Sequence, residues 1–313
     1  PIEVPPPEIL QLKMFESIDL NVLRAFFRQQ AEAGKEAIYE AKLLIVGEPG
    51  AGKTSLARKL IQPSAPLPAK DESTEGIDVH IWKFPIPGSY SAHQTSELLA
   101  KLPLDFQVNI WDFGGQSIYY ATHQFFLSRR SLYIIVADAR EQKNDFFYWL
   151  DLIEHLSDRS PVIIFNNEIQ NRRWSINEQQ LKYYFPETFQ RPFGFNLRDD
   201  TSELAILRRK IQEYITQLPH VGTLLPKTWV DVRRALENDQ RSTITIQEFL
   251  KLCEKNGFTR DEDALQLSTY LHDIGVILHF QDDPLLKRIV ILKPEWGTEA
   301  VYRVLDNEQV KDH

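Results

Sequence analysis

The stretch KLLIVGEPGAGKT, residues 42–54, decides the fold of this chain. Its first five residues are mostly apolar and of strand length, and the remainder fits the pattern G-x-x-x-x-G-K-[ST]. Glycines let such a loop wind tightly, so that its N–H groups point inward. A helical stretch follows, and the start of a helix adds the positive end of its dipole. The combination predicts a loop that holds phosphate groups.

The same loop supplies most of the predicted contacts to a nucleotide. We expect Lys53 to neutralise charge on the β- and γ-phosphates and Thr54 to offer its hydroxyl to Mg²⁺. Pro49 has no N–H, and its ring is expected near the γ-phosphate. We therefore expect hydrolysis without a conventional arginine inserted by another protein. The predicted contacts in the loop are Gly47, Pro49, Gly50, Ala51, Gly52, Lys53, Thr54 and Ser55.

From residue 41 the chain alternates strand-like and helix-like segments. Short apolar runs occur at 42–46, 79–84, 108–111, 132–137 and 162–165. Helical patterns lie between or after them, at 53–61, 118–127, 146–156, 178–184 and 203–215. Fully apolar strands alternating with amphipathic helices predict an α/β fold with a mainly parallel sheet covered on both faces. Ligands bind such sheets at the carboxyl ends of the strands.

The segments on either side follow a different pattern. Prolines 5–7 interrupt regular structure near the N-terminus, and a helix is predicted over 21–39. After residue 218, a proline-punctuated linker leads to three helical patterns and a strand-turn-strand pattern, which together predict a winged-helix-like module. These last elements are expected at 229–237, 246–254, 263–272, 276–280 and 288–292. We expect domains at 1–40, 41–217 and 218–313.

A second motif, WDFGGQ at 111–116, ends the apolar run that starts near residue 108. It contains the pattern D-x-x-G. This short pattern is informative here because it follows a strand and lies beyond the phosphate loop. We expect Asp112 to hold Mg²⁺ through water and the N–H of Gly115 to sense the γ-phosphate. Gln116 is expected to orient the attacking water, as the corresponding glutamine does in Ras-like proteins.

Two further residues bear on the metal. Thr74 lies in a polar loop before a strand, where a switch threonine would complete the Mg²⁺ shell, and such loops order with the triphosphate. Asp138 ends the apolar run LYIIVAD and resembles the acidic strand end of P-loop ATPases. If Asp138 held the metal, the protein would be an ATPase-type switch. We favour Asp112, because Gly115 and Gln116 accompany it.

The expected base-reading segment departs from the usual N-K-x-D pattern of Ras-like GTPases. After the run at 162–165, the best register is Asn167-Glu168-Ile169-Gln170. Gln170 replaces an aspartate that accepts two hydrogen bonds from guanine, and its amide has only one acceptor oxygen. We expect Asn167 and Gln170 to contact the base, with reduced selectivity for guanine. A later base-contacting loop is expected near residues 194–197.

Composition excludes several classes of function. The net charge of -8 argues against general nucleic-acid binding. The longest apolar runs are strand-sized, well short of the roughly 20 residues of a membrane span, and no signal peptide is recognisable at the start. The only cysteine, Cys253, is expected to be a small core residue. These features predict a protein of the reducing cytoplasm.

Several stretches together resemble the Roco family, whose members carry a Roc GTPase domain followed by a COR segment. The Roc-like stretches are EAKLLIVGEPGAGKTSL, STEGIDVHIW and WDFGGQSIYYATHQFFLSRRSLYIIVADAR. The COR-like stretches are LPKTWVDVRRALE, YLHDIGVILHFQDDPLLK and ILKPEWGTEAVYRVLDN, with the second half of COR missing. The segment PPPEI and the helix after it look like the exit from a leucine-rich repeat array in the same chain.

The resemblance implies a slow GTPase that uses Mg²⁺ and cycles between GTP and GDP, with nucleotide state coupled to homodimerisation, largely through COR. Lys53, Thr54, Thr74, Asp112 and Gly115 match the family pattern, whereas the base-reading segment does not. Two other functions stay open at this point. One is a nucleotide-binding scaffold without significant hydrolysis, and the other is the ATPase-type switch.

Overall fold

The computed structural model describes residues 20–68, 74, 76–86, 105–114, 126–138, 146–157, 159–168, 176–199, 201–284 and 286–297. The chain divides into two compact units. Of the described residues, 20–40, 86 and 219–297 belong to the first unit and the others to the second. The proline cluster at 5–7 and most of the helix expected at 118–127 lie outside the described ranges. Within those ranges, none of the helices has the length and apolar character to traverse a membrane.

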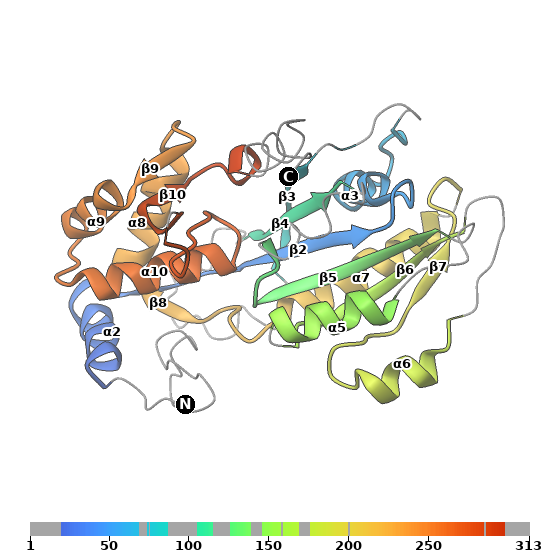
Figure 1. Ribbon diagram of the computed structural model, residues 1–313, viewed down its shortest axis with the longest axis horizontal. Helices are drawn as coiled ribbons and strands as arrows, with labels where there is room; N and C mark the ends of the chain where they lie inside the picture. Colours follow the sequence, from blue (N-terminus) through green and yellow to red (C-terminus); the bar gives the residue numbers. More distant parts are fainter. Residues whose placement is uncertain are drawn as a thin grey trace. The chain divides into compact units, whose positions relative to one another are not determined.

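A six-stranded sheet in the order β3-β4-β2-β5-β6-β7 forms the centre of the second unit (Figure 1). The pairs β2–β5, β5–β6 and β6–β7 are parallel, and β3–β4 is antiparallel. The predicted mainly parallel sheet is therefore confirmed. The strands are β2 (Glu40–Gly47), β3 (Ile77–Pro85), β4 (Asp105–Phe113), β5 (Ser131–Asp138), β6 (Val162–Asn167) and β7 (Phe193–Phe195). Strand β7 was not predicted, because three residues with a central glycine carry no periodic signal.

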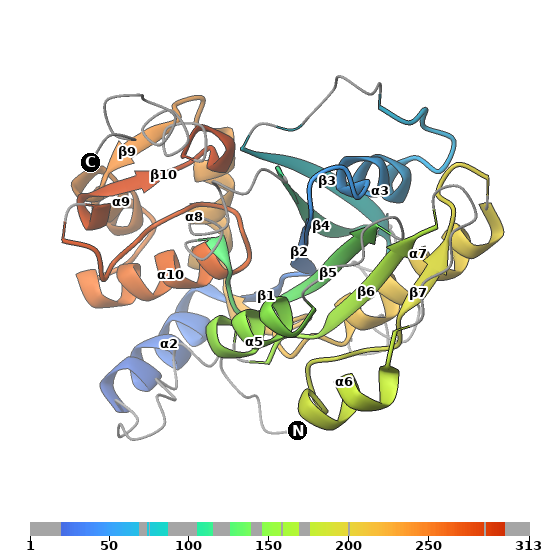
Figure 2. The same ribbon diagram turned by 45° about the vertical axis from the view of Figure 1, so that its right-hand side comes forward.

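Helices cover both faces of this sheet, as Figures 1 and 2 show for α5 and α7. Arg208 of α7 donates a hydrogen bond to the carbonyl of Leu60 at 2.9 Å, and its guanidinium lies 5.4 Å from the ring centre of Trp82. This contact fixes α7 against the end of α3. The helices of the unit are α3 (Lys53–Ile61), α5 (Phe146–Leu156), α6 (Glu178–Tyr184) and α7 (Thr201–Thr216).

A buried lysine lies within the largely apolar strand β2. The Lys42 side chain is fully buried, and its ammonium donates hydrogen bonds to the carbonyl of Phe126 at 2.8 Å and to Ser128 Oγ at 3.1 Å. It also lies 3.8 Å from the ring centre of Trp111. Because a buried charge is costly without partners, these contacts hold residues 126–128 against β2.

The first unit begins with α2 (Leu20–Ala33), which ends earlier than the helix predicted over 21–39. Gly34 adopts a φ of 84°, a left-handed conformation that ends the helix, and its N–H bonds the carbonyl of Gln30. Residues 35–37 then form β1 and pair with β8. The other elements are β8 (Leu224–Pro226), α8 (Lys227–Asn238), β9 (Thr243–Thr245), α9 (Ile246–Lys255), α10 (Asp261–Asp273), the short 3₁₀ helix η6 (Leu286–Arg288) and β10 (Ile289–Ile291).

The three predicted helices of this module are confirmed, and the two runs of the predicted strand-turn-strand do meet, but only through one antiparallel bridge. Strand β10 pairs antiparallel with β9, from which it is separated in the sequence by two α-helices and η6. The run 276–280 contributes only an isolated bridge between Leu278 and Ile291. The threonine-rich β9 escaped prediction because it is three residues long and leads directly into α9, where Thr245 forms a capping box with Glu248.

One core joins α2 to the module formed by residues 219–297. Phe26 of α2 packs edge-to-face on Trp229, with ring centres 5.6 Å apart, and Gln29 accepts a hydrogen bond from the Trp229 indole at 3.1 Å. Cys253 belongs to the same core and is fully buried, which confirms its expected role. Burial raises the pKa of its thiol to about 12, and the charge of Asp261 adds to this effect.

A buried ion pair lies within the same unit. The Arg233 guanidinium bonds both carboxylate oxygens of Glu40 and also Glu237, at 2.9 and 3.0 Å. The side chains of Arg233 and Glu40 are only 9% and 11% exposed. His220 also bonds the Glu40 carbonyl, at 2.9 Å. By contrast, the neighbouring Arg234 pairs with Glu36 at the surface, with side chains 51% and 39% exposed.

These two arginines provide a matched pair for mutagenesis. We predict that Arg233→Ala lowers the free energy of unfolding by about 3–5 kcal/mol, because it leaves the Glu40 carboxylate buried without its cation. Arg234→Ala should cost less than about 1 kcal/mol, as expected for an exposed pair. Denaturant unfolding of both variants checks this, and equal losses would contradict the assignment of the buried pair.

Candidate functional site

The phosphate loop connects the carboxyl end of β2 to α3 and depends on two of its glycines. Gly47 has a φ of 137° and lies tightly against the Val136 carbonyl of β5. Gly52 has a φ of 101°, and a Cβ at this position would lie 2.5 Å from the side-chain nitrogen of Asn167. Residues with side chains rarely adopt either conformation. The loop can therefore follow this path only with glycine at these positions.

Lys53, the first residue of α3, directs its ammonium across the loop. Its Nζ donates hydrogen bonds to the carbonyls of Gly47 and Glu48, both at 2.9 Å, and the residue is only 6% exposed. Burial lowers the pKa of Lys53 to about 8, against the opposing effects of the Asp112 and Glu48 charges. The loop thus holds the Lys53 ammonium within reach of its backbone.

Three oxygen-bearing side chains meet beside this lysine. Thr54 Oγ1 lies 2.8 Å from Thr74 Oγ1, and the Thr74 hydroxyl donates to Asp112 Oδ2 at 3.4 Å. They come from α3, from a position three residues before β3 and from the end of β4, which are far apart in the sequence. Asp112 is fully buried. Burial, assisted by the charge of Asp78, raises its pKa to about 6, whereas Thr54, Lys53 and Thr74 lower it.

The donor set of these residues fits a hard divalent cation. Two hydroxyls and a carboxylate are the oxygen ligands that Mg²⁺ prefers. Among the described residues, Asp112 Oδ1 has no hydrogen-bond partner although it is buried. A buried carboxylate oxygen without a partner is costly.

The segment expected to read the base lies beside the phosphate loop. Asn167, at the end of β6, is buried, and its Nδ2 donates to the Ala51 carbonyl at 3.0 Å. The N–H of Leu197 points to Asn167 Oδ1 at 3.5 Å. The N–H of Glu168 bonds the carbonyl of Phe195 at 3.1 Å. Asn167 therefore ties the phosphate loop to the loop after β7, where the later base contacts were expected.

Three of the predicted site residues fall outside the described ranges. Gly115, Gln116 and Gln170 lie outside the described residues. Asp138, the alternative metal ligand, is buried at the carboxyl end of β5 and is the register partner of Asn167 on β6. The hydrogen bonds described above connect Thr54 and Thr74 to Asp112.

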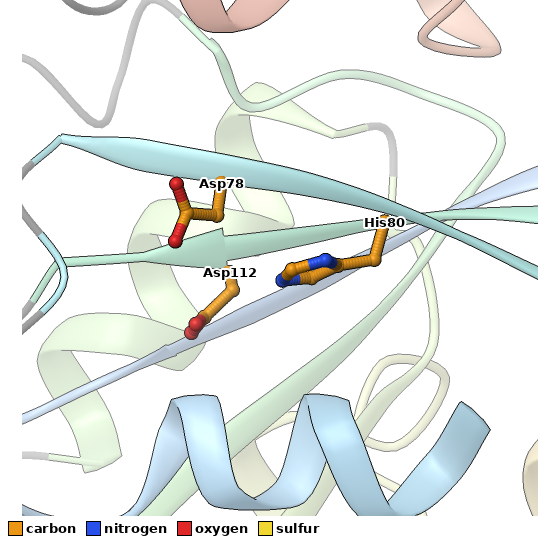
Figure 3. A group of neighbouring side chains, drawn as sticks. All are labelled: Asp78, His80 and Asp112. Atoms are coloured by element: carbon orange, nitrogen blue, oxygen red, sulfur yellow. The ribbon is translucent and has the colours of Figure 1, made fainter. Parts of the chain in front are cut away.

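The structure also brings together three residues of which only Asp112 was predicted. Asp78 and His80 of β3 lie beside Asp112 of β4, and ligand-type atoms of all three are within 4.8 Å of one another (Figure 3). The available sequence signal was the alternation in Ile77–Pro85, where polar Asp78 and His80 are two positions apart and so share one face of the strand. That Asp112 of β4 lies next to them follows from the pairing of β3 with β4, which the sequence pattern does not reveal.

The fold and the geometry of this site define a P-loop domain of the Ras-like class. Residues 42–170 match the family described as "Ras of Complex, Roc, domain of DAPkinase", and residues 226–313 match "C-terminal of Roc, COR-A domain". The chain is similar to the Methanosarcina barkeri structure "Roco2 RocCORdC bound to GDP", with a TM-score of 0.75 and 31% identity over 89% of this chain and 80% of that one. The chain belongs to the Roco family.

Curated relatives extend well beyond the region that matches this chain. The "Roc-COR-CHAT protease" of Runella zeae is 31% identical over 298 residues, covering 89% of this chain and 31% of that protein. The "Probable serine/threonine-protein kinase pats1" of Dictyostelium discoideum is 29% identical over 323 residues, covering 97% of this chain and 10% of that protein. The chain thus spans less than a third of the length of either relative.

The glycine geometry generates a prediction. Gly52→Ala should weaken nucleotide binding by at least about tenfold, because the new methyl group combines a strained φ with a clash against Asn167. Gly50→Ala is the matched control, since Gly50 also has a positive φ, 71°, but nothing lies within 4 Å of its virtual Cβ. Calorimetric titration with GDP measures both variants. If Gly50→Ala lost as much affinity as Gly52→Ala, backbone strain alone would explain the effect.

Proposed function

We propose that this chain is a guanine-nucleotide switch that binds Mg²⁺ and GTP or GDP and hydrolyses GTP slowly. The observation that carries the proposal is the convergence of Lys53, Thr54, Thr74 and Asp112 at the carboxyl end of the sheet. A lysine for phosphate charge and oxygen donors for a metal are the parts that a P-loop site requires.

Each residue has a proposed task. The loop from Gly47 to Ser55 binds the phosphates through its N–H groups, and the Lys53 ammonium exchanges its two carbonyl partners for phosphate oxygens. Thr54, Thr74 and Asp112 hold Mg²⁺, which when bound neutralises phosphate charge. Gly115 contacts the γ-phosphate and Gln116 orients water. The hydrogen bonds from Thr54 to Thr74 and from Thr74 to Asp112 favour Asp112 over Asp138 as the metal carboxylate.

The Thr74 hydroxyl is proposed as the part that reports nucleotide state. It is within hydrogen-bonding distance of both Thr54 and Asp112, at 2.8 and 3.4 Å, and so can exchange these partners for the metal. Such a contact orders a switch loop only while the triphosphate is present. We further propose that COR-A couples this change to homodimerisation, in a cytoplasmic protein that carries leucine-rich repeats in the same chain.

Guanine selectivity rests on Asn167 and on the related Methanosarcina barkeri structure bound to GDP. Gln170 replaces the usual aspartate, so we expect weaker discrimination than in proteins with N-K-x-D. We predict that GDP and GTP nonetheless bind more tightly than ATP. Titration of purified protein with the three nucleotides checks this, and ATP binding at least as tight as GDP binding would favour the ATPase-type switch instead.

Hydrolysis is tested at Gln116. In single-turnover assays with excess protein, Gln116→Leu should slow GTP cleavage by about tenfold or more, because leucine cannot orient water. Gln180→Leu, an exposed position on α6, is the matched control and should leave the rate unchanged. A wild-type rate no faster than that of Gln116→Leu would instead identify a nucleotide-binding scaffold. The slow rate expected from Pro49 is read from the same assay.

A further inference from the structure

The pairing of β3 with β4 places three ligand-type side chains on one face of the ladder. Asp78 and Asp112 are register partners, and His80 lies two residues further along β3, opposite Ile110. Residues at positions i and i+2 of a strand share a face, so His80 and Asp78 flank the same surface. Figure 3 shows the three side chains extending from the two neighbouring strands toward a common region. Their nearest ligand atoms are all within 4.8 Å of one another.

Two of these side chains carry buried atoms that lack a hydrogen bond within the described part of the chain. They are Asp112 Oδ1 and His80 Nε2. Asp112 is fully buried, and its other oxygen, Oδ2, is the one that accepts from Thr74 at 3.4 Å. A carboxylate oxygen and an imidazole nitrogen are both electron-pair donors, and buried polar atoms of this kind normally have a partner.

The charges at this point also call for a cation. Asp78 and Asp112 are opposite each other across the two strands, and like charges in directly opposed positions are destabilising. Lys53 offsets part of the Asp112 charge, and a bond from His80 would reach only one of the two carboxylates. A divalent ion between the three side chains would satisfy both buried atoms and neutralise both carboxylates at once.

We propose that Asp78, His80 and Asp112 bind a divalent transition-metal ion of the zinc class, at a site distinct from the Mg²⁺ shell of Thr54 and Thr74. One imidazole and two carboxylates suit zinc, cobalt or manganese better than magnesium, which prefers oxygen alone. Ligand atoms on one tetrahedral zinc ion lie about 3.3 Å apart. The three side chains must therefore close by at most roughly 1.5 Å, a distance that side-chain rotation covers. Asp78 is exposed, which gives the ion a route from solvent.

The site has a regulatory consequence, which rests on the proposed function because Asp112 is shared. An ion bound through Asp112 Oδ1 places two positive charges close to the expected Mg²⁺. The same ion holds Asp78, which lies four residues after Thr74 near the start of β3. Its occupancy should weaken the affinity of the GDP-loaded protein for Mg²⁺ severalfold. Transition-metal availability would then modulate the switch.

Cobalt is the probe for the site, because its visible absorption reports coordination without any nucleotide. The metal-free 313-residue chain is titrated with Co²⁺, and Zn²⁺ is then added in competition. We expect one saturable Co²⁺ site per chain, displaced by Zn²⁺, and binding that is weaker by at least about tenfold in both His80→Phe and Asp78→Asn. The matched control is His155→Phe, which removes an exposed histidine whose ring is 3.5 Å from Asp151, and should bind like the wild type.

The outcomes separate this proposal from the nucleotide function. Unaltered Co²⁺ binding in both variants, or no saturable binding by the wild-type chain, overturns the metal site whatever the nucleotide titrations show. If His80→Phe fails to fold, Asp78→Asn still tests the site, because it changes only an exposed side chain. GDP binding by Asp78→Asn verifies that this variant is folded. Should Co²⁺ bind as expected in a chain that binds no nucleotide, the metal site stands and the proposed function fails.

Discussion

The buried carboxylate of Asp112 is the constraint on which the nucleotide-site end of the sheet depends. A charged group without water is stable only where other groups supply charge and hydrogen bonds. Here these come from Lys53 and Thr54 at the start of α3 and from Thr74 ahead of β3. The chain must therefore bring a helix start, a loop and a strand end together, and that requirement shapes the site before any ligand arrives.

Buried charges recur elsewhere in the chain, each compensated in a different way. Lys42 uses backbone and hydroxyl oxygens and the face of Trp111. Arg233 instead uses two carboxylates, those of Glu40 and Glu237. The first arrangement holds residues 126–128, which follow the segment with the expected γ-phosphate sensors. The second holds the start of β2 to α8 within the first unit.

Prediction from sequence succeeded where the signal was local. The loop at 42–54 and the helices at 53–61, 146–156 and 178–184 have periodic patterns or fixed spacings, and the structure agrees with them. It failed where pairing between distant segments decides the outcome. Strand β10 pairs along its length with β9 and meets the nearer run at 276–280 through only one bridge, and Gly34 ends α2 because the next residues pair with β8.

The site shows the same division. Lys53, Thr54 and Asp112 were predicted from motifs, because phosphate and metal chemistry require these residue types at fixed spacings. Thr74 was predicted only from its place before a strand, yet its hydroxyl lies next to Thr54. Asp78 and His80 were not predicted at all, since their relation to Asp112 exists only through the register of β3 with β4.

Cys253 has a practical consequence for work on this protein. It is the only cysteine of the chain, it is fully buried, and the high pKa of its thiol leaves almost no thiolate at neutral pH. Alkylating reagents should therefore leave the folded wild-type chain unlabelled. A cysteine introduced at any exposed position would be the single reactive thiol, so fluorophores or spin labels can be attached site by site without first removing the native residue.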